Sequence, residues 1–198
     1  MPDYPTNRSR SYQLANMTYG ILTLERADRD GIPPVELRKL LQRKALVRVG
    51  RGVYKLPFGE WSGPVEEYIA VALIGPRGYL YGSSVLSIHG LLSRKPPKIK
   101  VGYDLYGALY LYSPTRKIRA NLPANIQVMY PQNTGETTEY LKIPSQTVHE
   151  AFLVEISGMF QNELQSALAK AFKSKLVTSA QRDEIDKKIK AHMALKAA

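Results

Sequence analysis

Four side chains suited to base recognition in DNA lie close together in residues 33–46, PPVELRKLLQRKAL: Arg38, Lys39, Gln42 and Arg43. Arginine and lysine can pair with guanine edges and glutamine with adenine, and each bidentate pair contributes roughly 1–3 kcal/mol of discrimination. Two further arginines, at 48 and 51, follow in RVGRGVYKLP. These residue types and their close spacing predict contacts with a nucleic acid.

The surrounding pattern places these side chains on a helix and a hairpin. Leucines at 37, 40 and 41 form one apolar helical face, and the four polar candidates fall on the other. Alternating apolar residues across 46–56 then predict two short strands, with Gly50-Arg51-Gly52 as the turn. We expect Val53 and Tyr54 to contribute to the core beneath this hairpin.

The preceding residues complete a recognisable order of elements. Residues 9–22 predict a helix, and residues 23–31 predict a short helix that Thr23 caps and Gly31 ends. Helix, short helix, helix and hairpin is the order of a winged helix-turn-helix, whose basic helix would enter the major groove. Arg48 and Arg51 would then contact phosphates or the minor groove. Arg8 and Arg10 would steer the domain to the DNA backbone.

A simpler interpretation applies to each of these signals. A basic helix face is usually a solvated surface, and a Gly-Arg-Gly turn is usually only a tight turn. Winged helices also serve as protein-docking modules. The shared order, spacing and positive charge favour DNA binding over these alternatives.

The composition supports an anionic partner. The chain of 198 residues has a net charge of +11. Residues 77–120 carry eight Lys/Arg against one Asp/Glu, and residues 1–62 carry eleven against six. There is no cysteine, no apolar run long enough to span a bilayer and no apolar segment typical of a signal peptide at the start. We therefore expect a cytoplasmic protein that does not associate with a membrane.

The segment FGEWSGP, residues 58–64, suggests a domain boundary, giving domains 1–60 and 61–198. Beyond it, helices are predicted over 64–75 and 79–92, the second capped by Ser83 or Ser84 and ended by Gly90. The segments KIKVGY, ALYLYSP, KIRAN and IQVMYP predict a small antiparallel sheet. A helix within 143–157, capped by Ser145, and two C-terminal helices follow. The expected class is α+β, an N-terminal winged helix-turn-helix and a mixed α/β C-terminal domain.

The basic block 77–120 predicts a second cationic surface. Its tyrosines could stack on single-stranded bases, but their high strand propensity favours ordinary sheet positions. The excess of charge suits DNA phosphates or an acidic protein. Five residues are candidates for these secondary phosphate or partner contacts: Lys98, Lys100, Arg116, Lys117 and Arg119.

Catalytic patterns are missing from the sequence. The three histidines, at 89, 149 and 192, have no partner at metal-ligand spacing. Ser83, Ser84 and His89 could suggest a hydrolase, but YGSSVL lacks the second glycine of a nucleophile elbow. No phosphate-binding glycine loop occurs. We expect no cofactor, no metal and no enzymatic activity.

Two motifs in order resemble the AbiEi family, which comprises antitoxins and transcriptional autoregulators of type IV toxin–antitoxin systems. The first, G-x-G-[VI]-Y, is matched by Gly50, Gly52, Val53 and Tyr54. The second, a serine-rich helix running into HGL, is matched by Ser83, Ser84, His89, Gly90 and Leu91. The stretch TVHEAFLVE departs from relatives, which often have an acidic residue nearer the helix start, so no toxin-contact residue is assigned.

The resemblance implies a function in two parts. The winged helix would bind double-stranded DNA at inverted repeats in its own promoter and repress it. The C-terminal domain would support cooperative assembly on DNA and counteract a nucleotidyltransferase toxin encoded next door, functionally or by direct contact. The alternatives are a stand-alone winged-helix repressor without a toxin partner and a protein-docking module that uses its basic face.

Overall fold

The chain forms two compact units, residues 1–76 and 77–198. The computed structural model describes residues 6–104 and 122–197. The division lies between Pro76 and Arg77. The functional domains expected at 1–60 and 61–198 stay a prediction.

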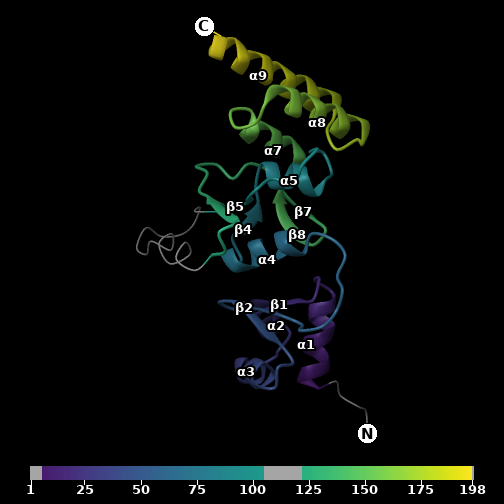
Figure 1. The fold of residues 1–198 in the computed structure, drawn as a ribbon, viewed down its shortest axis with the longest axis vertical. Helices are drawn as coiled ribbons and strands as arrows, with labels where there is room; N and C mark the ends of the chain where they lie inside the picture. The colour runs from purple at the N-terminus through teal and green to yellow at the C-terminus, as the bar shows by residue number, and fades with distance from the viewer. Residues whose placement is uncertain (1–5, 105–121, 198) are drawn as a thin grey trace. The chain divides into compact units, whose positions relative to one another are not determined.

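The first unit contains helices and short strands (Figure 1). Their order is α1 (Asn7–Asn16), β1 (Ile21–Thr23), α2 (Leu24–Arg29), α3 (Pro34–Gln42), β2 (Val47–Gly50), β3 (Val53–Lys55) and α4 (Val65–Ile74). The predicted caps are confirmed for α2 and α3: the Thr23 hydroxyl accepts from the Arg26 backbone N–H, and proline opens α3. The single helix expected over 9–22 was wrong, because α1 ends at Asn16 and a turn leads into β1. The Thr18 hydroxyl donates to the Ile21 carbonyl at 2.7 Å and supports that turn.

The three strands of this unit form an antiparallel sheet in the order β1-β3-β2. The predicted hairpin is confirmed, with Arg51 and Gly52 at its turn. Gly52 has φ +72°, a left-handed conformation that favours glycine. Its carbonyl accepts a 2.7 Å hydrogen bond from the Leu24 backbone N–H, which fixes the tip of the hairpin against the start of α2.

An apolar core joins α1, α2 and α3 to the sheet of this unit. Its fully buried members include Leu22, Ile32, Leu37 and Leu46. Val53 is buried at 1% exposure, and Tyr54 is half-buried against the cluster, as the alternation predicts. The rigid core gives α3 a fixed inner face.

The second unit contains the strands β4 (Gly78–Leu80), β5 (Ile99–Tyr103), β6 (Ile126–Met129), β7 (Thr137–Tyr140) and β8 (Ile143–Gln146). They form one sheet in the order β6-β5-β4-β8-β7. Of the four segments expected to form an antiparallel sheet, KIKVGY and IQVMYP contain β5 and β6, and these two strands pair in parallel instead. The sheet is mixed, since β4–β5 and β7–β8 are antiparallel and β4–β8 is parallel, and the sequence analysis did not predict β4, β7 or β8 as strands. The segments ALYLYSP and KIRAN lie outside the described residues.

Helices α5 (Ser83–Ile88), α7 (Val148–Glu155), α8 (Gln161–Lys173) and α9 (Ser179–Ala197) complete the unit. The helix expected over 79–92 is shorter, because its first residues form β4 and Gly82 precedes α5. Neither Ser83 nor Ser84 is its cap. Ser145 is likewise not a cap, since it is buried in β8 and Thr147 caps α7. Residues 79–80 and 143–146 were expected within helices, but they form parts of strands β4 and β8.

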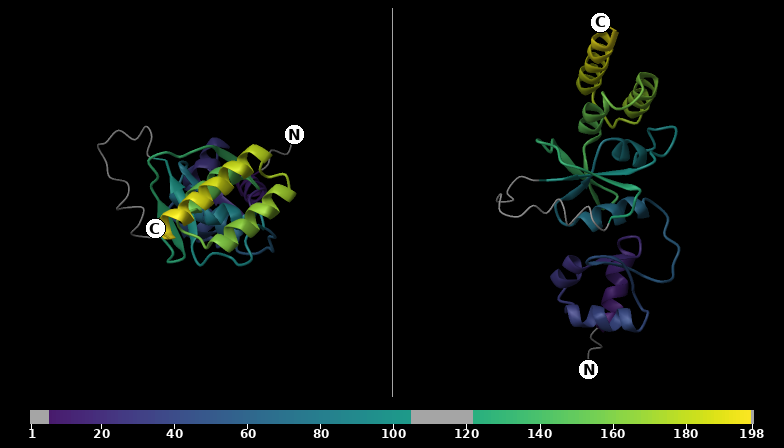
Figure 2. Two further views of the ribbon diagram at one scale, coloured as in Figure 1. Left: turned by 90° about the horizontal axis from the view of Figure 1, so that it is seen from above. Right: turned by 60° about the vertical axis from the view of Figure 1, so that its left-hand side comes forward.

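The last two helices form a hairpin that packs on α7. Helices α8 and α9 run side by side in both views (Figures 1 and 2), joined by residues 174–178. Leu164 and Leu168 of α8 and Ile185 and Ile189 of α9 are buried. Among the residues described, no helix combines the length and apolar character needed to cross a membrane.

Candidate nucleic-acid interface

Helix α3 presents two chemically distinct faces. Leu37 and Leu40, at 1% and 5% exposure, lie in the core of the first unit. The opposite face carries the four predicted recognition side chains, and all are exposed: Arg38, Lys39, Gln42 and Arg43. The amphipathic pattern therefore orients the helix as expected, because burying the leucines turns the polar face to solvent.

Three of these four side chains are available for an external partner. The side chains of Arg38, Gln42 and Arg43 make no hydrogen bond or ion pair with another described residue. Lys39 differs, since its Nζ lies 2.7 Å from Glu36 Oε1 within the same helix. Two guanidinium groups and one amide are thus free to pair with base edges or phosphates.

Val35 belongs to the same exposed face, although the sequence analysis did not select it. It is 49% exposed, and it lies three residues before Arg38 and four before Lys39, so the three neighbour one another on the helix. An exposed apolar side chain on a recognition helix suits the thymine methyl group. The signal was present in the sequence as this i, i+3, i+4 spacing.

The β2–β3 hairpin presents Arg51 to solvent at its tip. Arg51 makes no hydrogen bond or ion pair with another described residue. Arg48 is also exposed, but its Nε donates to the Gly50 carbonyl at 3.2 Å. The arginine at the tip is therefore the less constrained of the two.

The two arginines of α1 already have partners within the chain. Arg10 Nη2 donates to the Asp30 carbonyl and lies 3.1 Å from Asp30 Oδ2. The Arg8 guanidinium carbon stands 5.7 Å from the centroid of the Tyr12 ring. Arg10 thus joins α1 to the end of α2, which is a structural role that sequence reasoning missed.

Two of the five residues predicted to form a second cationic surface, Lys98 and Lys100, differ in their surroundings in the structure. Lys98 is exposed and has no partner among the described residues. Lys100 is held inside the unit, since its Nζ lies 2.6 Å from Glu155 Oε1 and Glu155 is only 2% exposed. The remaining three candidates, Arg116, Lys117 and Arg119, lie outside the described residues.

Glu155 lies in a buried polar cluster with the segment Gly82-Ser83-Ser84. Its Oε1 accepts from the Ser83 backbone N–H at 2.8 Å, and Gln146 Oε1 accepts from the Gly82 N–H at 2.9 Å. A side chain at Gly82, whose φ is +52°, would collide with Glu155. Ser84 Oγ accepts from the Lys100 N–H at 2.7 Å. The segment therefore positions β5, α5 and α7 together.

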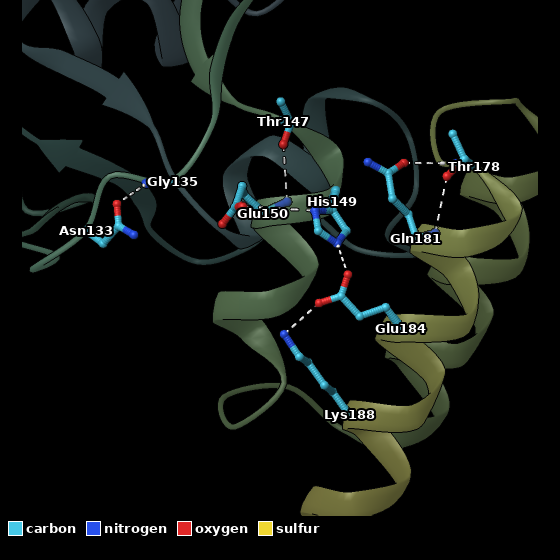
Figure 3. Close-up of polar contacts among 9 residues, drawn as sticks. All are labelled: Asn133, Gly135, Thr147, His149, Glu150, Thr178, Gln181, Glu184 and Lys188. Atoms are coloured by element: carbon cyan, nitrogen blue, oxygen red, sulfur yellow. Dashed lines mark hydrogen bonds and ion pairs between the residues drawn. The ribbon is translucent and has the colours of Figure 1, made fainter.

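Two of the three histidines, His89 and His149, contact an aromatic or an acidic neighbour. His89 stacks on Tyr140 with ring centroids 3.8 Å apart, and its burial lowers its pKa. Figure 3 shows His149 Nε2 3.0 Å from Glu184 Oε2, across the contact between α7 and α9. Hydrogen bonds with Lys188 and His149 lower the pKa of Glu184. Within the ranges described, no three His, Asp or Glu side chains gather closely enough to hold a metal ion.

The match to a known family falls on the unit that carries α3. Residues 9–57 match the model of a family described as "Transcriptional regulator, AbiEi antitoxin". This match confirms the resemblance over the segment that runs from α1 through the β2–β3 hairpin. No curated protein matches the chain.

Proposed function

We propose, from the similarity of residues 9–57 to the AbiEi antitoxin family of transcriptional regulators, that this chain binds double-stranded DNA through a winged helix-turn-helix. The DNA would be its own promoter, with inverted repeats as the operator. We further propose that the chain is the antitoxin of a type IV system and counteracts a nucleotidyltransferase toxin. Assembly on adjacent repeats would be cooperative.

The order of elements supports the winged helix-turn-helix. Helices α1, α2 and α3 alternate with a three-stranded antiparallel sheet whose last two strands form a hairpin. In such a domain the helix before the hairpin enters the major groove, and the hairpin flanks it. The elements α3 and β2–β3 would take these two positions.

The observation that carries the proposal is the unpaired polar face of α3. Arg38, Gln42 and Arg43 are exposed, have no partner among the described residues and lie opposite the buried leucines. The fourth candidate on this face, Lys39, is paired with Glu36 of the same helix. The side chains of Arg38, Gln42 and Arg43 have hydrogen-bond donors without acceptors, and they lie on the face that a winged helix presents to DNA. Their placement supports contacts with bases and phosphates.

The direct test is binding of labelled duplexes tiled across the region upstream of the gene. Fluorescence anisotropy with the full chain should identify a segment bound at least about 1,000-fold tighter than a scrambled duplex of equal composition. The double variant Arg38→Ala/Gln42→Ala should lose that preference. Lys187→Ala, which removes an exposed charge from α9, serves as the control. Equal binding of native and scrambled duplexes would refute operator recognition.

The antitoxin part needs a separate growth assay. The neighbouring open reading frame is expressed from an inducible promoter, with and without this chain supplied from an unrelated promoter. Growth arrest that this chain relieves would support neutralisation beyond repression. If the neighbour is harmless, or arrest persists, the chain acts at most as a stand-alone repressor.

A further inference from the structure

Val35 lies at the centre of the exposed face of α3, and it is 49% exposed. With about 100° between successive helical residues, it is about 140–160° around the helix axis from the buried side chains of Leu37 and Leu40. Arg38 and Lys39 flank it on opposite sides, about 60° and 40° away. An apolar side chain therefore occupies the part of α3 that is farthest from the core.

The argument for a contact comes from this position. Exposure alone would not be sufficient, because isolated apolar side chains are common on protein surfaces. Val35 is the second residue of α3, and the first residues of a recognition helix are those that reach the base edges in helix-turn-helix domains. A valine placed against a polar base edge would displace water without replacing its hydrogen bonds, at a cost in free energy.

The major groove offers one apolar group that such a side chain can contact, which is the C5 methyl group of thymine. A contact between the valine methyl groups and this methyl group removes apolar surface from water on both molecules. We infer that Val35 contacts a thymine methyl group and thereby selects a T·A base pair in the operator. This inference rests on the proposed binding of DNA through α3 and adds to it the identity of one base.

The neighbouring arginine fixes where this thymine should lie. Three residues advance an α-helix by about 4.5 Å, and successive base pairs of B-DNA are about 3.4 Å apart. The Arg38 side chain makes no hydrogen bond or ion pair with another described residue, so it is free to pair with a guanine edge. We expect the thymine within about two base pairs of the position at which Arg38→Ala relaxes base preference.

The experiment uses the full chain and the operator duplex identified by the tiling assay. Each thymine is replaced in turn by deoxyuridine, which removes the C5 methyl group and leaves the hydrogen-bonding groups of the base in place. The Kd of each duplex is measured by fluorescence anisotropy for the wild-type chain and for Val35→Ser, which removes both valine methyl groups.

Two controls separate base recognition from a structural effect. Serine and valine have similar helix propensities, so α3 should persist in Val35→Ser, and thermal unfolding followed by circular dichroism checks this. Leu195→Ala removes an apolar side chain that is 79% exposed and lies in α9, in the second unit. It should bind every duplex as the wild-type chain does.

For the wild-type chain, deoxyuridine at the contacted position should raise the Kd about fourfold, which corresponds to one methyl group returned to water. Val35→Ser should bind the unmodified operator at least about fourfold more weakly, and the same deoxyuridine should then change its Kd by less than about 1.5-fold. This loss of sensitivity in the variant identifies the methyl group and Val35 as contact partners.

Equal effects of deoxyuridine on the wild-type chain and on Val35→Ser at every position would overturn the inference and leave operator recognition intact. An equal loss of affinity by Val35→Ser for operator and scrambled duplexes would also overturn it, because Val35 would then contact the DNA backbone. If the wild-type chain prefers no duplex over its scrambled control, the proposed operator recognition fails, and this inference fails with it.

Discussion

Arg51→Ala isolates the contribution of the hairpin tip to DNA binding. Its side chain is exposed and has no partner in the described part of the chain, so its removal should change the free energy of unfolding by less than about 0.5 kcal/mol. One phosphate contact contributes about 0.9 to the slope of log K against log salt. Between about 50 and 200 mM salt, that slope corresponds to about a 3.5-fold change in affinity.

The assay is operator binding by anisotropy at several salt concentrations in this range, for the wild-type chain and the variant. The variant should bind all duplexes more weakly and show a slope smaller by about 1. Lys187→Ala removes the same charge from α9 and controls for a general effect of net charge. An unchanged slope for Arg51→Ala would show that the hairpin tip does not touch phosphate.

Four further outcomes follow from the contacts described. Arg38→Ala should relax preference at one base pair by about 1–3 kcal/mol in a duplex mutation series, whereas a uniform loss would mean a phosphate contact only. Arg10→Ala should lower the free energy of unfolding by about 1 kcal/mol in urea titrations, because α1 loses its bonds to the end of α2, and the salt slope should stay unchanged if Arg10 is structural. Glu155→Gln should lower the free energy of unfolding by about 3 kcal/mol in the same titrations, because it leaves the half-buried Lys100 ammonium without its counter-charge. A urea midpoint equal to that of the wild type would contradict the structural role of the pair. Burial lowers the pKa of His89 in the folded state, so the unfolded chain binds more protons as the pH falls below about 6.5, and thermal stability is lost. His89→Gln should lessen this loss. If the melting temperatures of wild type and variant change equally between pH about 7.5 and 5, His89 does not contribute.

The sequence predicts the first unit well because local signals agree with one another there. Thr23, the proline at the start of α3, and the leucines at 37 and 40 all specify the same helices, and the alternation after Ala45 specifies the hairpin. The error at residues 17–22 has a clear cause. Ile21 and Leu22 fit a helical spacing after Leu14, but pairing with Lys55 and Tyr54 of β3 makes them a strand. That pairing joins residues more than thirty positions apart, which a local pattern cannot detect.

The second unit is less predictable because its strands are short and pair with segments distant in the sequence. Gly78–Leu80 and Ile143–Gln146 each directly precede a helix, and pairing with β5 and β7, together with the contact between β4 and β8, makes them strands. The same limit applies to Lys100. Its position in a basic block suggests a surface contact, but its partner, Glu155, comes from α7, 55 residues later in the chain. Charge counts along a sequence do not reveal an internal ion pair.

This pair changes how the segment Gly82-Ser83-Ser84, which lies outside the matched residues 9–57, should be interpreted. Gly82, Ser83 and Ser84 give their backbone and side-chain groups to Gln146, Glu155 and the Lys100 amide, so the segment is used inside the unit. Contacts with another molecule are therefore sought on exposed groups without internal partners. In this chain those include Arg38, Gln42 and Arg43 of α3 and Arg51 at the tip of the hairpin, which is why variants that test DNA binding are placed there.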